Sequence, residues 1–535
     1  MTDRLTRRDF AKAAAAAALA ASVLPGTAKA ETSDKKTLRF IAQSDLRVLD
    51  PIWTTAYISR NHGYCVFDTL FAIDAEFAPH PQMVEDFSIS PDKLTYQFKL
   101  RDGLGSFHDG SPVRGADCVA SVKRWMARDS HGQSLALVLD EMKPDGDKGF
   151  TIKLKEPFPL LIDAFAKVSS LALFVMPERL ANTDPFQQVT EAIGSGPLKF
   201  VKDEFQPGHQ VVYVKNTDYV SRKEPPSWAS GGKVMKVDRV EWLYIPDAMT
   251  KVAALNAGEA DWWENPPLDL VPALQANPDI TLALADPLPS PIMVKFNHLL
   301  PPFDNVKMRQ AVLAATNQAD YLTALAGDQK NWEPCPSFFT CGTPMANDAG
   351  SAALTGPRDL EKAKKLVADA GYKGEKVVVL DAVDQPVAHS QALVVTDVLK
   401  KLGVNVDLQA MDWGTLVTRR ASMEPIDKGG WNIFATGWVG ADLLDPGGNP
   451  ALRTNGKKSH FGWPSDDKIE ALRAQWLNAA TLADRKKIAA QIQERAFEVV
   501  PYIPTGQWKP VTAFRKNVKG VLQAPAFLMW NVEKT

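Results

Sequence analysis

Aspartate and tryptophan side chains come directly after two neighbouring strands that the sequence predicts. The four residues are Trp413, Trp438, Asp442 and Asp445. In open α/β sheets ligands bind beyond the carboxyl ends of strands. There, flat aromatic rings form apolar walls, and an aspartate can hold an ammonium group by a charge-assisted hydrogen bond. The pattern predicts recognition of a small polar molecule, although core positions for both tryptophans and a turn before Pro446 for Asp445 are the alternative interpretation.

A further candidate cluster is Asp261-Trp262-Trp263-Glu264, which follows a helical stretch at 248–258. If this segment is a strand, its side chains alternate between two faces. One tryptophan would then enter the core and the other would face a cleft. Trp263 and Glu264 therefore join the candidate ligand-binding residues.

The segment 356–438 contains the elements that must position the first four residues. Apolar residues recur with helical spacing in 359–370, and Gly371 ends that helix. The remaining predicted elements are strands at 376–380, 404–410 and 431–436 and helices at 387–402 and 414–423. Strands that alternate with helices of this length are typical of crossover units and a mostly parallel sheet. This region is therefore predicted to be α/β.

The N-terminal third has a different pattern. A Ser-Pro-Asp-Lys turn divides residues 87–100 into two arms. The second arm places Tyr96 and Phe98 on one face and Gln97 on the other. This alternation predicts an antiparallel hairpin with one solvated side. Another strand is expected at 150–155, and a strand-rich block runs from about 194 to 285. The changes of character along the chain indicate lobes built from non-contiguous pieces.

Motifs of enzymes and metal sites are missing from the sequence. It contains no G-x-S-x-G elbow and no H-E-x-x-H pair, and its eight histidines are widely spaced. The formal net charge of −2 gives no electrostatic footprint for nucleic acid. We therefore expect no catalytic residues, no cofactor, no metal and no nucleic-acid partner.

The first thirty residues predict an export signal. A charged start is followed by an alanine-rich run and by small residues at Ala28 and Ala30, which form an A-x-A cleavage site. Arg7 and Arg8 further resemble a twin-arginine signal. No later stretch approaches the ~18 apolar residues of a membrane span. We expect a periplasmic protein that is exported by the twin-arginine pathway.

The chain has four cysteines. Cys335 and Cys341 flank a loop-like stretch, so a short-range disulfide is expected in an oxidising compartment. Cys65 and Cys118 lie in apolar segments. They form either two free buried thiols or a second disulfide.

Motifs along almost the whole chain resemble one protein family. They occur in order at 49–51, 66–70, 83–96, 107–110, 194–197, 255–259, 303–311 and 363–371. Each motif is weak alone, but the ordered set is similar to the extracytoplasmic solute-binding proteins of bacterial ABC importers, family 5, the dipeptide/oligopeptide-binding type. The resemblance covers residues 37–525.

This resemblance implies a two-lobe periplasmic binding protein fold of type II, in the enlarged peptide-binding class, with an extra α+β domain. Lobe I would combine 31–75, 196–290 and 500–535, the extra domain would be 76–195, and lobe II would be 291–499. In peptide-binding members an aspartate after the Gly-Trp of a lobe II strand holds the amino terminus of the peptide. The matching segment is one residue longer in this chain, so Asp442 and Asp445 compete for that role.

The resemblance further implies a monomeric receptor that captures a short peptide or peptide-like polar solute between closing lobes and delivers it to permease subunits in the inner membrane. Because the family also takes other solutes, a receptor for an oligosaccharide or an opine is the alternative. An exported hydrolase is a further alternative from a different class.

Overall fold

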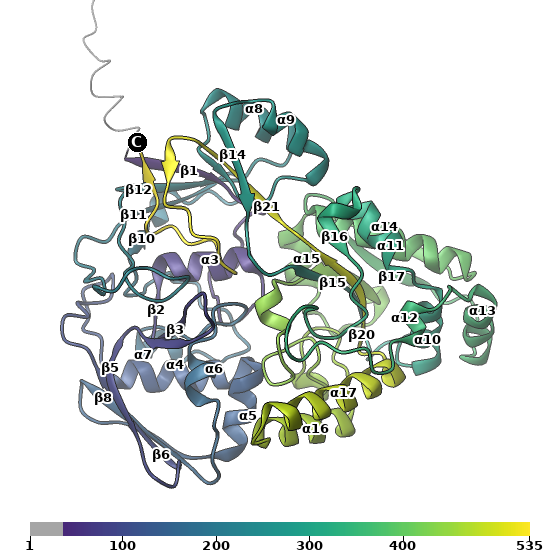
Figure 1. Cartoon of the computed structure of the whole chain (residues 1–535), viewed down its shortest axis with the longest axis horizontal. Coiled ribbons are helices and arrows are strands. Elements are labelled where there is room, and N and C mark those ends of the chain that lie inside the picture. The colour runs from purple at the N-terminus through teal and green to yellow at the C-terminus, as the bar shows by residue number, and fades with distance from the viewer. Residues whose placement is uncertain (1–35) are drawn as a thin grey trace, which may run out of the picture.

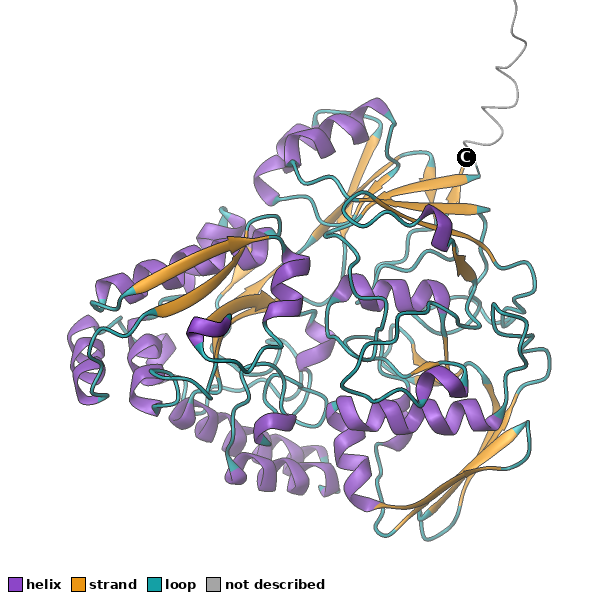
Figure 2. Cartoon of the chain, turned by 180° about the vertical axis from the view of Figure 1, so that it is seen from behind, coloured by secondary structure: helices purple, strands orange, loops and turns teal. Residues whose placement is uncertain are grey.

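The computed structural model describes residues 36–535, and the predicted export signal with Arg7 and Arg8 lies outside these residues. Two large sheets and one small sheet organise the described chain (Figure 1). We call the part built on the first large sheet lobe I, the part built on the second lobe II, and the part around the small sheet the small domain. All three parts contain both helices and strands (Figure 2).

Lobe I contains a seven-stranded sheet drawn from distant segments. Its spatial order is β10 (Leu198–Phe200), β11 (Gln210–Lys215), β12 (Arg239–Leu243), β1 (Thr37–Ile41), β13 (Trp262–Trp263), β21 (Val511–Arg515) and β14 (Ile280–Leu284). Strand β1 lies parallel to β12 and β13, whereas β21 is antiparallel to β13 and β14. Its helices are α3 (Tyr57–Val66), α8 (Ala248–Ala257) and α9 (Val271–Gln275). Glutamate and glutamine side chains that follow β13 and β1 therefore emerge at the same edge.

Lobe II contains a six-stranded mixed sheet. Its order is β16 (Trp332–Glu333), β20 (Tyr502–Trp508), β15 (Ser290–Phe296), β19 (Ile433–Gly437), β17 (Val377–Ala382) and β18 (Val406–Met411). Only β17 makes parallel pairs, with β18 and β19. The mostly parallel arrangement predicted for 356–438 is thus confirmed for these three strands, but β15 and β20 make the complete sheet mixed.

Helices surround the sheet of lobe II, and α15 (Trp413–Arg419) lies on the side that faces lobe I (Figure 1). The others are α10 (Val306–Ala315), α11 (Gln318–Ala326), α12 (Ala352–Thr355), α13 (Leu360–Asp369), α14 (Pro386–Lys401), α16 (Asp467–Asn478) and α17 (Leu482–Val499). Helix α15 is shorter than the predicted helix at 414–423, and a separate 3-10 turn follows at Ile426–Lys428. The side chain of Asp412 accepts a hydrogen bond from the backbone N–H of Thr415 and so caps α15.

The small domain carries the antiparallel sheet β5 (Val84–Ile89), β6 (Thr95–Leu100), β8 (Gly149–Leu154) and β7 (Leu139–Pro144). The predicted hairpin is confirmed, because β5 pairs with β6 and Tyr96 and Phe98 are buried while Gln97 is exposed. Its helices are α4 (Gly115–Arg128), α5 (Ser130–Val138), α6 (Leu161–Phe165) and α7 (Glu178–Ala181). Short pairs, β2 (Asp68–Thr69) with β9 (Phe174–Val175) and β3 (Phe71–Ile73) with β4 (Pro79–Pro81), join it to lobe I.

Two antiparallel segments connect the lobes. Strand β14 of lobe I leads into β15 of lobe II, and β20 of lobe II leads back into β21 of lobe I. Because β14 pairs with β21 and β15 pairs with β20, the two crossings run side by side, with a hydrogen bond from Ala285 N to Pro510 O (3.0 Å) between them. We call this pair of crossings the two-strand connection. The expected boundary at residue 500 needs correction, since β20 belongs to lobe II by its pairing with β15.

The four cysteines have two different states. Cys335 and Cys341 form the expected disulfide, whereas Cys65 and Cys118 are free and buried. The two free thiols belong to the apolar core that extends from lobe I into the small domain. Among residues 36–535, no helix is both long enough and apolar enough to cross a bilayer.

Candidate functional site

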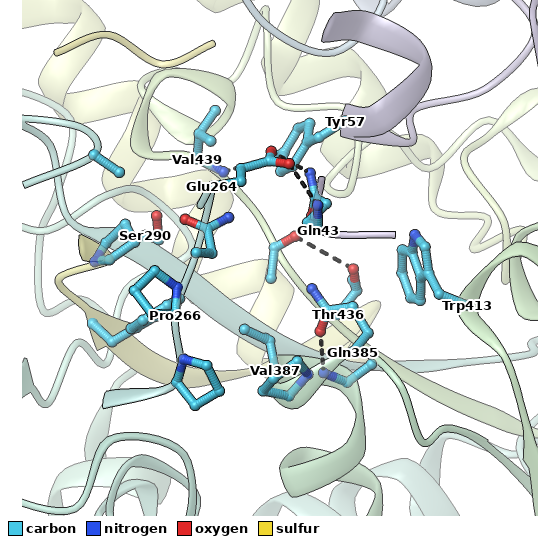
Figure 3. A pocket seen from close by; sticks show the side chains of 18 of the residues that line it. Gln43, Tyr57, Glu264, Pro266, Ser290, Gln385, Val387, Trp413, Thr436 and Val439 are labelled. Carbon is cyan, nitrogen blue, oxygen red and sulfur yellow. Dashed lines mark hydrogen bonds between the residues drawn. The ribbon is translucent and has the colours of Figure 1, made fainter. Parts of the chain in front are cut away.

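A cavity of about 210 Å³ lies between lobe I and lobe II. Residues beyond the carboxyl ends of β1, β13, β14, β17 and β19 line it, as the general rule for α/β sheets predicts. Glu264 and Gln43 lie on one side, and Gln385, Val387 and Thr436 lie across the cavity from them (Figure 3). We call this cavity the central pocket.

Four of the six predicted ligand-binding residues line the central pocket: Trp263, Glu264, Trp413 and Trp438. Trp413 stands at its flank (Figure 3). Both Trp262 and Trp263 are buried, but Trp263 reaches the pocket while the indole of Trp262 donates to Thr512 within lobe I. The pocket therefore brings together these three predicted tryptophans, and Trp508 at the end of β20 also lines it.

Asp442 lies behind the wall of the pocket and does not line it. Its Oδ2 accepts hydrogen bonds from the hydroxyl of Tyr57 (2.7 Å) and from that of Ser169 (3.0 Å). The same Tyr57 hydroxyl accepts a hydrogen bond from the backbone N–H of Val439 (2.6 Å), so it bridges the two lobes. Burial raises the pKa of Asp442, and its Oδ1 has no hydrogen-bond partner within the described chain. Asp442 thus positions Tyr57, which does line the pocket.

Asp445 lies outside the central pocket. Its Oδ1 accepts a hydrogen bond from the backbone N–H of Gly448 (2.8 Å) in the turn after Pro446. It also faces His131 of the small domain, whose pKa is lowered by burial and partly restored by the charge of Asp445. The interpretation of Asp445 as a turn residue therefore describes its place in the fold.

Glu264 is a fully buried carboxylate at the end of β13. It accepts three hydrogen bonds, from the backbone N–H of Gln43 (2.7 Å), from Gln43 Nε2 (2.9 Å) and from Asn61 Nδ2 (3.1 Å). Burial raises the pKa of Glu264 to about 7, and these hydrogen bonds oppose the shift. No ion pair of Glu264 is formed within residues 36–535. The carboxylate is therefore well positioned, and it makes no direct ion pair in the described chain, although the charge of Arg60 lowers its pKa.

Asp286 is a second buried carboxylate in the pocket, and sequence reasoning missed it. Its Oδ1 accepts a hydrogen bond from Leu288 N (2.9 Å), while Oδ2 has no partner among the residues described. Burial raises the pKa of Asp286 to about 7. The available signal was its position directly after a predicted strand, which is the same signal that identified Trp438.

Two cations of lobe I approach these carboxylates. Arg60 Nη1 donates to Ser169 Oγ (2.5 Å), and its guanidinium carbon lies 4.3 Å from the ring centroid of Tyr57. Lys251 lies over Trp263 with its Nζ 5.8 Å from the ring centroid, and burial lowers its pKa. Both residues line the pocket. The lobe I wall therefore combines charges of both signs.

Arg420 is the buried cation on the lobe II wall, and it too was missed. It follows α15, and its guanidinium carbon lies near the ring centroids of Phe461 (4.9 Å), Trp413 (5.4 Å) and Phe434 (5.7 Å). Burial lowers the pKa of Arg420 to about 9. Cation–π contacts of a desolvated guanidinium contribute about 2 kcal/mol each, whereas burying an ion costs several kcal/mol even after relaxation. The three rings therefore offset much of this cost.

The chemistry of the central pocket is that of recognition. Buried charges of both signs face one another between aromatic walls, and such sites orient a polar ligand by a few convergent groups. Within the described residues, no cluster of histidine, cysteine, aspartate and glutamate has the geometry of a metal site. The arrangement suits a small molecule that carries charged ends.

Comparisons with known proteins agree with this geometry. The family model of bacterial extracellular solute-binding proteins, family 5, matches residues 78–460. A probable peptide ABC transporter periplasmic-binding protein, y4tO of Sinorhizobium fredii, is 41% identical over 534 residues and is matched over 99% of each chain. The glutathione-binding protein GsiB of Escherichia coli K12 is 26% identical, with coverage of 89% of this chain and 90% of the other.

Solved structures show the same fold. The periplasmic binding protein AgaA of A. tumefaciens R10, in complex with agropinic acid, aligns with a TM-score of 0.76 at 22% identity, covering 93% of this chain and 99% of the other. DppA of Helicobacter pylori, in complex with the peptide STSA, also has a TM-score of 0.76, at 20% identity, covering 94% and 99%.

Proposed function

Because the chain belongs to the bacterial extracellular solute-binding proteins of family 5, we propose that it is the periplasmic substrate-binding receptor of an ABC importer. It captures a short peptide or a peptide-like polar solute in the central pocket. It binds this solute without converting it chemically. The relative with 41% identity, itself a probable peptide-binding protein of an ABC transporter, supports this assignment.

The observation that carries the proposal is the buried carboxylate of Glu264, which makes no direct ion pair in the described chain. An ammonium group at the amino terminus of a peptide supplies the partner for such a pair, and a charge-assisted hydrogen bond is about twice as strong as a neutral one. Asp286, with an unpaired Oδ2 in the same pocket, provides a second acceptor. Trp413 and Trp438 then act as walls for the rest of the solute.

In this proposal Asp442 acts through Tyr57 and does not touch the amino group. Its carboxylate accepts a hydrogen bond from the Tyr57 hydroxyl, which in turn accepts one from the backbone N–H of Val439 in lobe II. The Asp442–Tyr57–Val439 bridge is complete only when the two lobes approach each other, so it belongs to closure of the lobes around a solute.

Identification of the natural solute tests the proposal directly. Protein purified gently from the periplasm is denatured, and mass spectrometry of the released compound is expected to find a short peptide or another solute with a free amine. Calorimetric titration with the identified peptide and its N-acetyl derivative should show a large loss of affinity for the acetylated form. A released oligosaccharide or opine would assign the receptor to the alternative solute class, and turnover of the bound compound would contradict a pure receptor.

The proposal includes export by the twin-arginine pathway, delivery to permease subunits of the inner membrane, and a monomeric state. Changing Arg7→Lys and Arg8→Lys together should leave precursor in the cytoplasm, because that pathway recognises the paired arginines. Fractionation followed by immunoblotting measures the result. A normal periplasmic yield of the double variant would contradict this route.

A further inference from the structure

Arg420 makes far fewer hydrogen bonds than the structural arginines of this chain. Arg124, which is equally buried, donates to the carbonyls of Thr183, Asp184 and Gln187 and forms an ion pair with Asp50 (2.6 Å). Within the described residues, Arg420 makes one hydrogen bond, from Nη2 to Thr55 Oγ1 at 3.4 Å, and its buried Nε has no partner. A guanidinium presents five donors. The fold therefore leaves most of the hydrogen-bonding capacity of Arg420 unused.

Arg420 also lies at the partition between two cavities. Thr55 lines both the central pocket and a second cavity of about 250 Å³ between the small domain and lobe II. The hydroxyl of Thr55 is within hydrogen-bond distance of His460 Nε2 (3.2 Å), and it accepts the bond from Arg420. Phe461, which stacks on the guanidinium, lines the second cavity.

Every charged side chain that lines the second cavity in the described structure is basic: Arg128, Arg453, Lys457 and Lys458. Only Arg453 has a carboxylate partner, Glu470, with 3.2 Å between Nε and Oε2. Arg128 donates to the backbone carbonyl of Trp53 and lies over the ring of Phe186, 4.8 Å from its centroid. The two lysines are exposed. The second cavity therefore extends the positive potential of Arg420 away from the carboxylates of lobe I.

We propose that Arg420 binds an anionic group of the solute and that the basic second cavity favours solutes with this acidic group at that end. The group is a carboxylate or a phosphate, because both present two or more oxygens that match the planar guanidinium fork. This inference rests on the proposed function and deepens it. The receptor selects acidic peptides, or peptide-like solutes with an added acidic group, over neutral ones of the same size.

The three aromatic rings around Arg420 serve this role by holding the guanidinium flat and in place. Trp413 and Phe434 on lobe II and Phe461 beside the second cavity restrict its rotation. A guanidinium whose N–H donors are already held in position loses little conformational entropy when it binds its ligand. Trp413 and Phe461 therefore act as positioning residues for the anion.

Paired probes test the selectivity. Protein freed of endogenous solute by reversible unfolding is titrated calorimetrically with tri-alanine peptides in which each position in turn is glutamate or glutamine. A parallel set carries phosphoserine or serine. At one position we expect the acidic probe to bind at least ~10-fold tighter than its neutral partner, as for a charged hydrogen-bonded pair. The probe set, glutamate or phosphoserine, that gives the larger ratio of acidic to neutral affinity shows whether the bound group is a carboxylate or a phosphate.

Variants assign this selectivity to Arg420. Arg420→Met should reduce the ratio of acidic to neutral affinity to within about 2-fold of unity, whereas Arg420→Lys should keep part of it because the charge remains. Arg419→Met is the matched control, since Arg419 is the adjacent arginine and donates to the backbone of Gly429 and Gly430 instead. The double change Lys457→Gln and Lys458→Gln should lower the ratio by a few-fold at low salt only, because exposed charges are screened.

Two results would overturn the inference. One is a wild-type protein that binds every acidic and neutral pair equally; the other is an unchanged ratio in a folded Arg420→Met variant. Failure of all tripeptides to bind would instead contradict the peptide assignment. In that case N-(1-carboxyethyl)alanine and its monoamide decide the role of Arg420, because a preference for the diacid that disappears in Arg420→Met supports anion binding by a non-peptide solute.

Discussion

The two walls of the central pocket hold their buried charges differently. On the lobe I wall, Glu264 accepts three hydrogen bonds of 2.7 to 3.1 Å. On the lobe II wall, Arg420 makes a single long bond of 3.4 Å within the described residues. The position of the carboxylate is therefore set by the fold itself, whereas the guanidinium is held mainly by aromatic rings. The difference suggests that Glu264 fixes the position of the solute by binding its amino group. Arg420 then distinguishes acidic solutes from neutral ones.

The difference also separates stability from function. A buried group that is hydrogen bonded by the fold keeps its position whether or not a solute is bound. A buried charge that is left without a counter-charge lowers stability until a ligand pairs with it. The following predictions test this distinction, in order of decreasing expected effect.

Removing both charges should cause the largest loss of affinity. Each of Glu264→Gln and Arg420→Met is expected to weaken binding of the preferred acidic tripeptide by roughly 30-fold or more, the lower end of the effect of truncating a buried charge pair. Because the two residues hold opposite ends of the solute, the double variant should lose roughly 1,000-fold, the product of the single effects.

Calorimetric titration of the wild type, both single variants and the double variant completes this cycle. A double variant that is no weaker than Glu264→Gln alone would show that the two residues do not bind separate groups.

The stability of the ligand-free protein should depend on pH through Glu264. Burial raises the pKa of Glu264 from an ordinary value of 4.5 to about 7, so folding favours the protonated form. The stabilisation that this preference provides is complete below pH 4.5 and is lost as pH rises through 7. The loss is about 3 kcal/mol for a shift of this size.

Urea unfolding of the wild type and Glu264→Gln at pH 4.5, 6 and 8 measures this effect. The difference in unfolding free energy between the two proteins should shift in favour of the glutamine variant as pH rises. Asp286, whose pKa is raised in the same direction, is present in both proteins and largely cancels. A difference that does not change with pH would contradict the assignment.

Arg420→Met should stabilise the ligand-free protein while it weakens binding. An apolar side chain of similar length fits among Trp413, Phe434 and Phe461 without the cost of burying a charge. Replacing buried charges by well-packed apolar residues often adds about 1–4 kcal/mol, and we expect about 1–3 kcal/mol. Denaturant unfolding without solute measures the gain, with Arg419→Met as the control. Destabilisation of Arg420→Met would mean that the fold itself requires the guanidinium.

Asp442→Asn should have the smallest effect. Asp442 lies behind the wall, and an asparagine carbonyl can still accept the hydrogen bond of Tyr57. We expect affinity to fall by less than ~10-fold, which corresponds to about 1.4 kcal/mol. A loss comparable to that of Glu264→Gln would show that the solute reaches the buried Oδ1 of Asp442.

Sequence periodicity was enough to predict the local elements of both lobes and the hairpin of the small domain. It did not identify β20, because Tyr502–Trp508 is buried throughout and lacks the alternation that marks a half-buried strand. The pairing of β20 with β15 joins residues about two hundred positions apart, and that contact is a property of the tertiary fold. The three parallel strands were predictable because their crossover helices are close in sequence.

The candidate site was predictable where a residue follows a strand, and not where it comes from elsewhere. Trp413, Trp438 and Glu264 satisfy that rule, and Trp263 is the last residue of β13. Arg420 lies at the end of a predicted helix, where an arginine is typical of a solvated face. Its burial results from Phe434 and Phe461, which local patterns do not bring together with it. The sequence shows the extra residue before Asp442, but it does not show whether the side chain of Asp442 points toward the pocket.

The two-strand connection limits how the receptor can move. Its strands are hydrogen bonded to each other on both sides of the crossing, so sliding or stretching one against the other breaks bonds, whereas bending across the ribbon keeps them. Bending across the ribbon is therefore the motion that this connection resists least. Asp286 and Trp508 adjoin this connection and line the pocket, so the bending axis passes beside the solute. In the proposed transport role, a permease that contacts both lobes would sense closure of the receptor as a change in this bend.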